Sequence, residues 1–219
     1  MRTPNAGLRA AVVAAILFVG VAGVEGSIRP AFDWDRHAIS MLSLGERGWV
    51  MVATFLVTGA LVMWVAASLR AVDARRRWVS RLVTAFSIGL ILAGFFPAPR
   101  GQGFPAGTPS NLEPEMTTTA ILHSVAFQLA FTSLIVAAVL MTVAYARERR
   151  PRWALFSGFS AVLIPVLIAL GATRTIPTGI GFYLASCVAW AWLAAVAVQH
   201  LVVAADARPR QSPRSHALP

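Results

Sequence analysis

The stretch GWVMVATFLVTGALVMWVAASL, residues 48–69, decides the fold, because it contains no Asp, Glu, Lys or Arg and is long enough to cross a lipid bilayer. A hydrocarbon core about 30 Å thick needs roughly 20 consecutive apolar residues in helical form. The stretch also lacks the alternation of polar and apolar positions expected of a membrane-spanning strand, and only helices or closed barrels satisfy backbone groups in lipid. It therefore predicts a transmembrane helix.

Five further runs without a charged side chain flank this one. The six predicted spans are residues 10–24, 48–69, 82–99, 116–146, 153–173 and 175–205. The chain of 219 residues is 57% hydrophobic and 13% charged, whereas soluble domains average about 25% charged residues. We predict an all-α integral membrane protein with a six-transmembrane-helix bundle in a single domain, residues 1–207. A disordered basic tail, residues 208–219, is expected to follow.

All nineteen basic residues other than histidine are arginines, and they divide unevenly between the two sides of the predicted bundle. Fourteen lie in the two terminal tails and in the second and fourth connections: Arg2, Arg9, Arg70, Arg75, Arg76, Arg77, Arg81, Arg147, Arg149, Arg150, Arg152, Arg208, Arg210 and Arg214. The other connections hold Arg29, Arg36, Arg47, Arg100 and Arg174. Because cytoplasmic loops carry the positive excess, both termini are predicted in the cytoplasm and the chain in the bacterial plasma membrane.

The formal net charge of +10 has the same origin, since the whole positive excess falls on the predicted cytoplasmic side and the other side is slightly negative. It suits the anionic headgroups of the lipid bilayer, and no aromatic stacking platform accompanies it, so nucleic acid is not expected as a partner. The first span is also compatible with a cleaved secretory signal, because a short apolar run follows Arg2 and Arg9. We favour a retained anchor.

Polar chemistry concentrates in the predicted outer connections. Asp35 and Gly45 are suited to begin and end a short interfacial helix over residues 36–44. On such a helix His37 and Ser40 share a face, and the apolar residues on the other sides are expected to enter the headgroup boundary. The candidate ligand-binding residues are Asp33, Arg36, His37, Ser40, Arg100 and His123.

The start of the fourth span supplies the last of these candidates. His123 is an ionisable residue close to the lipid, which makes it a functional candidate. Ser124, Gln128 and Thr132 follow at helical spacing and are expected to form a stripe that faces the interior of the bundle.

Three functions fit these residues. In the first, a small or lipidic ligand binds, or passes through, a polar site on the outer face of the bundle. In the second, the protein is a membrane-embedded hydrolase, either with zinc on His37, His123 and Asp33 (or Asp35 in its place) or with Ser40 as a nucleophile beside His37. In the third, the helices present loops to a partner in a structural or accessory role.

Three short segments resemble a family of bacterial membrane proteins called the domain of unknown function 998 family. They are Ile39-Ser40-Met41-Leu42 with Gly45 after it, Gly94-Phe95-Phe96-Pro97 at the end of the third span, and His123. The resemblance implies six transmembrane helices and draws attention to Ser40 and His123, without implying a reaction. An acidic residue commonly follows the Phe-Pro pair in that family, whereas this chain has Ala98, Pro99 and Arg100 there.

Overall fold

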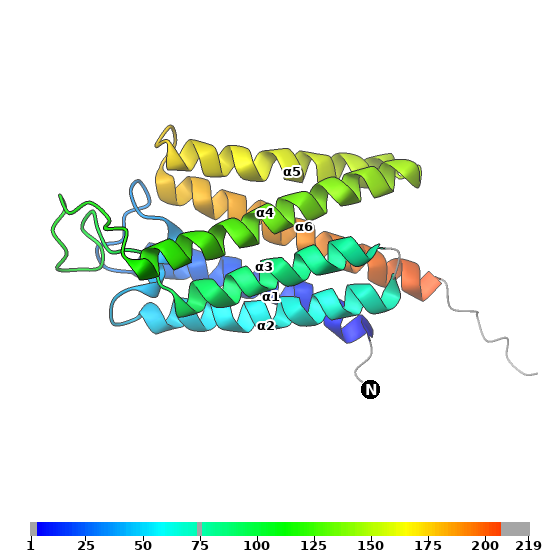
Figure 1. Ribbon diagram of the computed structural model, residues 1–219, viewed down its shortest axis with the longest axis horizontal. Coiled ribbons are helices and arrows are strands. Elements are labelled where there is room, and N and C mark those ends of the chain that lie inside the picture. Colours follow the sequence, from blue (N-terminus) through cyan, green and yellow to red (C-terminus); the bar gives the residue numbers. More distant parts are fainter. Residues whose placement is uncertain (1–3, 74–75, 207–219) are drawn as a thin grey trace, which may run out of the picture.

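The computed structural model describes residues 4–73 and 76–206. It contains six long helices and one short 3₁₀ helix, η1, and no strand is present within these two ranges (Figure 1). The elements are α1 (Pro4–Ile28), η1 (Ile39–Ser43), α2 (Gly48–Val72), α3 (Arg77–Phe95), α4 (Thr118–Arg147), α5 (Pro151–Ala172) and α6 (Thr178–Asp206). The predicted basic tail, residues 208–219, lies outside the described residues.

Each of the six long helices is long and apolar enough to cross a membrane. Large apolar side chains such as Ile16, Leu155, Phe159 and Val162 are more than half exposed on their outer faces, which suits contact with lipid rather than water. The protein is therefore a multi-pass membrane protein, and the predicted all-α six-helix fold is confirmed. The helix ends shift by a few residues; α1, for example, continues past the predicted end at residue 24 through Glu25 to Ile28.

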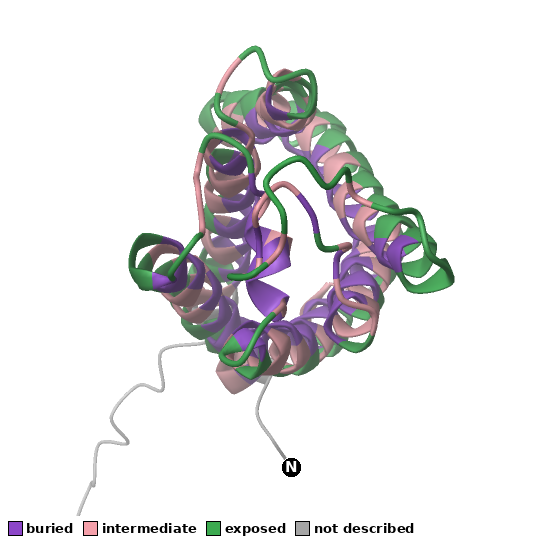
Figure 2. Ribbon diagram, turned by 90° about the vertical axis from the view of Figure 1, so that its left-hand side faces the viewer, coloured by how far each residue is buried: buried purple, intermediate pink, exposed green. Residues whose placement is uncertain are grey.

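The six helices form a closed ring in chain order. Each packs against the next along the sequence, and α1 packs against α6, which closes the ring (Figure 2). Small residues allow close approach in several of these seams, as between α3 and α4, where Gly89 lies against Ala126 and Ala130.

The short helix η1 lies in the mouth of this ring, in contact with α1, α2 and α6 (Figure 2). The predicted short helix in this connection is present, but it is shorter than residues 36–44 and packs into the bundle. The helix begins at Ile39, no side chain caps it, and Met41 and Leu42 are buried in the bundle rather than exposed to headgroups. Its position depends on contacts with three other helices, which the local sequence does not encode.

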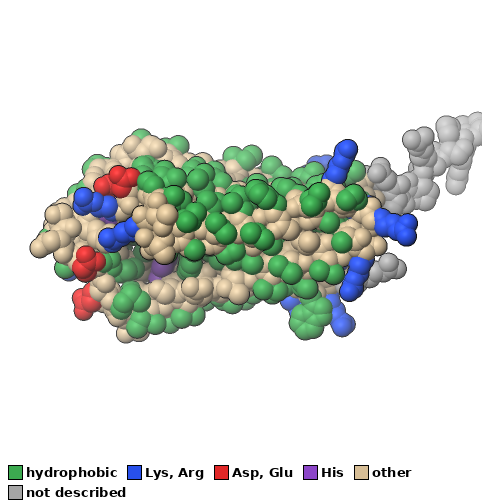
Figure 3. All heavy atoms as spheres, turned by 90° about the horizontal axis from the view of Figure 1, so that it is seen from above, with side chains coloured by type: hydrophobic (Ala, Val, Ile, Leu, Met, Phe, Trp, Pro, Cys, Tyr) green, Lys and Arg blue, Asp and Glu red, His purple; other side chains and the backbone are tan. Residues whose placement is uncertain are grey.

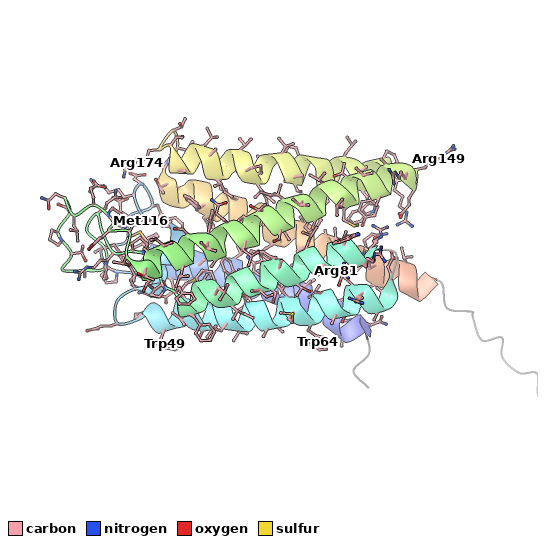
Figure 4. The ribbon with its side chains drawn as sticks, in the orientation of Figure 1. Trp49, Trp64, Arg81, Met116, Arg149 and Arg174 are labelled. Carbon is pink, nitrogen blue, oxygen red and sulfur yellow. The ribbon has the colours of Figure 1, made fainter. Side chains whose placement is uncertain are left out.

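The two ends of the bundle differ in charge and in loop length. The long-loop end consists of residues 29–47, 96–117 and 173–177, whereas the arginine-rich end holds the start of α1, the end of α6 and two short connections. Figure 3 shows arginines projecting at one end, mixed charges at the other and a hydrophobic surface between them. Arg81 and Arg149 lie at the arginine-rich end, and Arg174 lies at the opposite one (Figure 4). The predicted division of the connections into two groups is therefore present in the fold.

Candidate functional site

His37 joins two of the long loops through both of its ring nitrogens. Its Nδ1 accepts the backbone N–H of Asp33 at 2.9 Å, and its Nε2 lies 2.9 Å from the carbonyl oxygen of Gln102. A carbonyl only accepts, so Nε2 carries the proton. The ring also packs between Phe32 and Phe104, with centroid separations of 5.5 and 5.4 Å. The buried His37 side chain therefore connects the loop of residues 29–47 to the loop of residues 96–117.

Asp33, Arg36 and Arg100 lie on the surface of the long-loop end. Arg36 and Asp33 form a largely exposed ion pair with an N–O distance of 3.5 Å, and Arg100 is exposed after the end of α3. Of the six candidate residues, the structure brings only Ser40 and His123 to a common cavity, while His37 and Asp33 meet in the loop beside it.

A buried ion cluster that the sequence did not point to fixes η1 in place. Glu25 accepts hydrogen bonds from Arg29 through one carboxylate oxygen and from Arg47 through the other, the latter at 2.6 Å. Arg29 also donates to the carbonyl oxygens of Leu44 and Arg47, each at 3.0 Å. The cluster ties the last turn of α1 to the chain between η1 and α2. The sequence feature that could have indicated this cluster is Glu25, an acid directly after the apolar run of residues 10–24, with Arg29 one helical turn later.

A cavity of about 310 Å³ lies inside the ring beneath η1. Its floor is an aromatic layer drawn from four helices, in which Phe18 packs against Phe55 and Trp190, and Trp190 against Phe86, with centroids 5.2 to 5.5 Å apart. Its roof includes Ile39, Ser40 and Met41 of η1. The volume falls at the small end of the range of about 300–1,000 Å³ for small-molecule sites, and the walls are mostly apolar.

The cavity reaches the surface of the bundle beside α4. Ser124 and Gln128 line it and are themselves exposed. The distance between α4 and α5 increases toward the long-loop end (Figure 1). None of the described lining residues belongs to α5. Because Ser124 and Gln128 lie within the α4 span, the opening faces the bilayer.

The stripe of Ser124, Gln128 and Thr132 does not face the interior of the bundle as predicted. All three residues are exposed, and the inward face of α4 carries His123, Ala126 and Ala130. Ser124 satisfies its hydroxyl within the helix, by donating to the Ala120 carbonyl at 2.9 Å. The stripe therefore lies on the outer side of α4, and its first two members are at the rim of the cavity.

His123 contributes a polar side chain to the mostly apolar cavity wall. The imidazole is buried, and its Nδ1 lies 2.7 Å from the carbonyl oxygen of Phe96, at the end of α3. The capping of α4 places it there, because the Thr117 side chain accepts the N–H of Ala120 at the start of the helix. Ser40 belongs to the opposite element, η1, and lines the same space.

The donor set does not favour the zinc site predicted on His37, His123 and Asp33. Both nitrogens of His37 are engaged by backbone groups, and His123 lines the cavity rather than joining the Asp33 loop. Residues 4–73 and 76–206 contain no group of three His, Cys, Asp or Glu side chains placed to hold a metal ion.

The segments that resemble a known family converge on this cavity. Ile39, Ser40 and Met41 form its roof, Phe96 holds His123 by its carbonyl, and His123 lines the wall. A family model described as "Protein of unknown function (DUF998)" matches residues 12–199. The chain belongs to the DUF998 family. No curated protein and no solved structure matches it.

This DUF998 protein has an apolar surface where the family resemblance leads us to expect an acid. Ala98 and Pro99 line the cavity after the Phe-Pro pair, while Arg100 is exposed and outside the lining. A carboxylate at position 98 or 99 would face the same space as His123. Among the described residues, none that lines this space carries a carboxylate.

Proposed function

We propose that this DUF998 protein binds a lipidic ligand in the cavity inside its helix ring, with the apolar chain over the aromatic floor and the polar end at Ser40 and His123. One observation carries the proposal: a mostly apolar cavity inside a membrane-spanning bundle opens beside α4, at exposed Ser124 and Gln128. The neighbouring α4 residues Ile121 and Val125 are exposed and apolar, so lipid lies at the entrance.

The ring architecture makes the first helix part of the site. Phe18 of α1 belongs to the aromatic floor, and α1 closes the ring between α2 and α6. These contacts support the hypothesis that the first span is retained as an anchor rather than removed as a signal. A chain lacking α1 would lose part of the cavity floor.

Filling the cavity tests the proposal. Ala189 lines the cavity and is buried, whereas Ala191, two residues along the same helix, is exposed. We expect Ala189→Phe to reduce the amount of co-purified lipid seen by native mass spectrometry at least about tenfold, because the larger ring occupies the space of the chain. Ala191→Phe should retain lipid at the wild-type level.

Equal lipid retention in the two variants would contradict a ligand in this cavity. Both substitutions add the same side chain to α6, so a general effect on expression or detergent binding would appear in both. Measuring the thermal unfolding temperature of each variant confirms that Ala189→Phe is folded when its lipid content is determined.

We also propose that the arginine-rich end faces the cytoplasm of a bacterial cell, with the long loops outside. Cys187 is the only cysteine, so Cys187→Ala gives a background without thiols. In that background we expect a membrane-impermeant maleimide to label Ser110→Cys, in a long loop, in intact cells. Arg149→Cys should be labelled only after the membrane is permeabilised, and the reverse pattern would overturn the orientation.

A further inference from the structure

Apart from the exposed Gln128 amide at its rim, the cavity wall presents two polar groups without a partner among the residues that the structure describes: the Nε2 atom of His123 and the hydroxyl of Ser40. His123 is only 7% exposed. Within the described residues, every side-chain nitrogen or oxygen that is fully inaccessible has a hydrogen-bond partner, whereas the Nε2 of His123 has none. Its Nε2 is therefore accessible from the cavity. Leaving such a group unpaired in an apolar site is costly, which favours a ligand that pairs with it.

The contact with Phe96 determines what His123 offers. A backbone carbonyl only accepts, so the proton of the neutral ring is on Nδ1, and Nε2 keeps its lone pair. The cavity thus presents a hydrogen-bond acceptor at a fixed position. A matching ligand must carry an O–H or N–H donor.

The other hydroxyls in the wall have already used their one donor within a helix. Ser186 donates to the carbonyl of Phe182 at 2.9 Å, and Ser124 donates to that of Ala120. Ser40 is the remaining hydroxyl, and its own backbone carbonyl accepts from Ser43 at 2.7 Å. Its Oγ is available as a second donor or acceptor beside the ligand.

The lining also excludes a charged head. None of the described lining residues is Arg, Lys, Asp or Glu. A carboxylate or phosphate would lose its hydration without gaining an opposite charge, and the cost of burying an unpaired ion is large. The nearest candidate cation in the sequence, Arg100, is exposed and outside the lining.

We infer that the ligand is a neutral, hydroxyl-bearing lipid whose hydroxyl donates to His123 Nε2 while Ser40 contacts the same head. The cavity volume of about 310 Å³ is small for a lipid, which favours a single chain. This inference rests on the proposed lipid-binding function and adds the class of the ligand. A monoacylglycerol has the required features: one chain, no charge and hydroxyl donors at one end.

The test compares three probes that share an oleoyl chain. Monooleoylglycerol has hydroxyl donors, methyl oleate has none, and oleate is an anion at pH 8. Each is added to delipidated protein in detergent, and the bound fraction is measured by native mass spectrometry. We expect monooleoylglycerol to bind roughly two- to tenfold more tightly than methyl oleate, the effect of one net hydrogen bond, and oleate to bind weakest.

A variant pair isolates His123. In His123→Asn, the side-chain amide can still donate to the Phe96 carbonyl, but the acceptor at the position of Nε2 is removed. His200→Asn is the matched control, because His200 is also buried and its Nδ1 also contacts a backbone carbonyl, that of Val196, away from the cavity. Only His123→Asn should reduce monooleoylglycerol binding to the level of methyl oleate. Ser40→Ala, which leaves the imidazole in place, should reduce it in part.

The outcomes separate this inference from the proposed function. If monooleoylglycerol and methyl oleate bind equally well and both are lost in Ala189→Phe, the cavity binds lipid but the recognition of a hydroxyl is wrong. Preferential binding of oleate, or unchanged monooleoylglycerol binding in both His123→Asn and Ser40→Ala, overturns the inference in the same way. If no probe binds in a manner that depends on Ala189, the proposed function itself fails.

Discussion

Glu25→Ala is expected to lower the free energy of unfolding by about 3–5 kcal/mol, the cost of removing one partner from a buried ion pair. The Glu25 and Arg29 side chains are only 5% and 6% exposed, so the substitution would leave a guanidinium buried near the end of α1 without its carboxylate. Arg29 also holds the carbonyls of Leu44 and Arg47, and its displacement would release η1 from the mouth of the ring. Denaturant unfolding in detergent, followed by tryptophan fluorescence, measures the loss.

Two neighbouring substitutions serve as controls for Glu25→Ala. Glu46 is exposed, and Glu46→Ala should leave stability nearly unchanged. Arg47 is half exposed, at 54% of its side chain, so Arg47→Ala should cost about 1 kcal/mol or less. A loss for Glu25→Ala no greater than that for Glu46→Ala would show that the buried cluster does not stabilise the protein.

The sequence was sufficient to predict the six spans, because the hydropathy of a transmembrane helix is a local property. It was not sufficient for η1, whose place depends on contacts between residues far apart in the chain. His37 contacts Gln102, and Glu25 contacts Arg47. Each pair is too far apart in the chain to be predicted from the residue spacing of a helix or a strand. Asp35 was expected to cap a helix with its side chain, but no side chain caps η1. The backbone carbonyl of Asp35 instead accepts the N–H of Thr178, in the first turn of α6.

The candidate site was predicted in part for a similar reason. Helical spacing correctly grouped Ser124, Gln128 and Thr132 on one face, but it does not say which face is inward. That depends on the neighbouring helix, and α3 packs against Ala126 and Ala130. The spacing of these small residues, four apart, was the available signal for the inward face. The cavity itself lies between residues of five long helices and η1, so no single segment could reveal it.

Gly89→Ala is expected to destabilise the protein by about 1–3 kcal/mol, although the same substitution in an open helix stabilises it. A Cβ atom at Gly89 would lie 2.7 Å from the carbonyl oxygen of Ala126 and 2.8 Å from the backbone nitrogen of Ala130. Backbone atoms cannot turn aside as a flexible side chain can, so α3 and α4 would have to separate. The thermal unfolding temperature in detergent should fall.

The control for this prediction is Gly20→Ala in α1, where an added Cβ would meet nothing within 4 Å. Alanine has a higher helix propensity than glycine, so this variant should gain up to about 1 kcal/mol, and the two substitutions should shift the unfolding temperature in opposite directions. An increase for Gly89→Ala would mean that the α3–α4 backbones are farther apart than described. Since Gly89 also lines the cavity, that result would enlarge the space available to a ligand and weaken the case for a single chain.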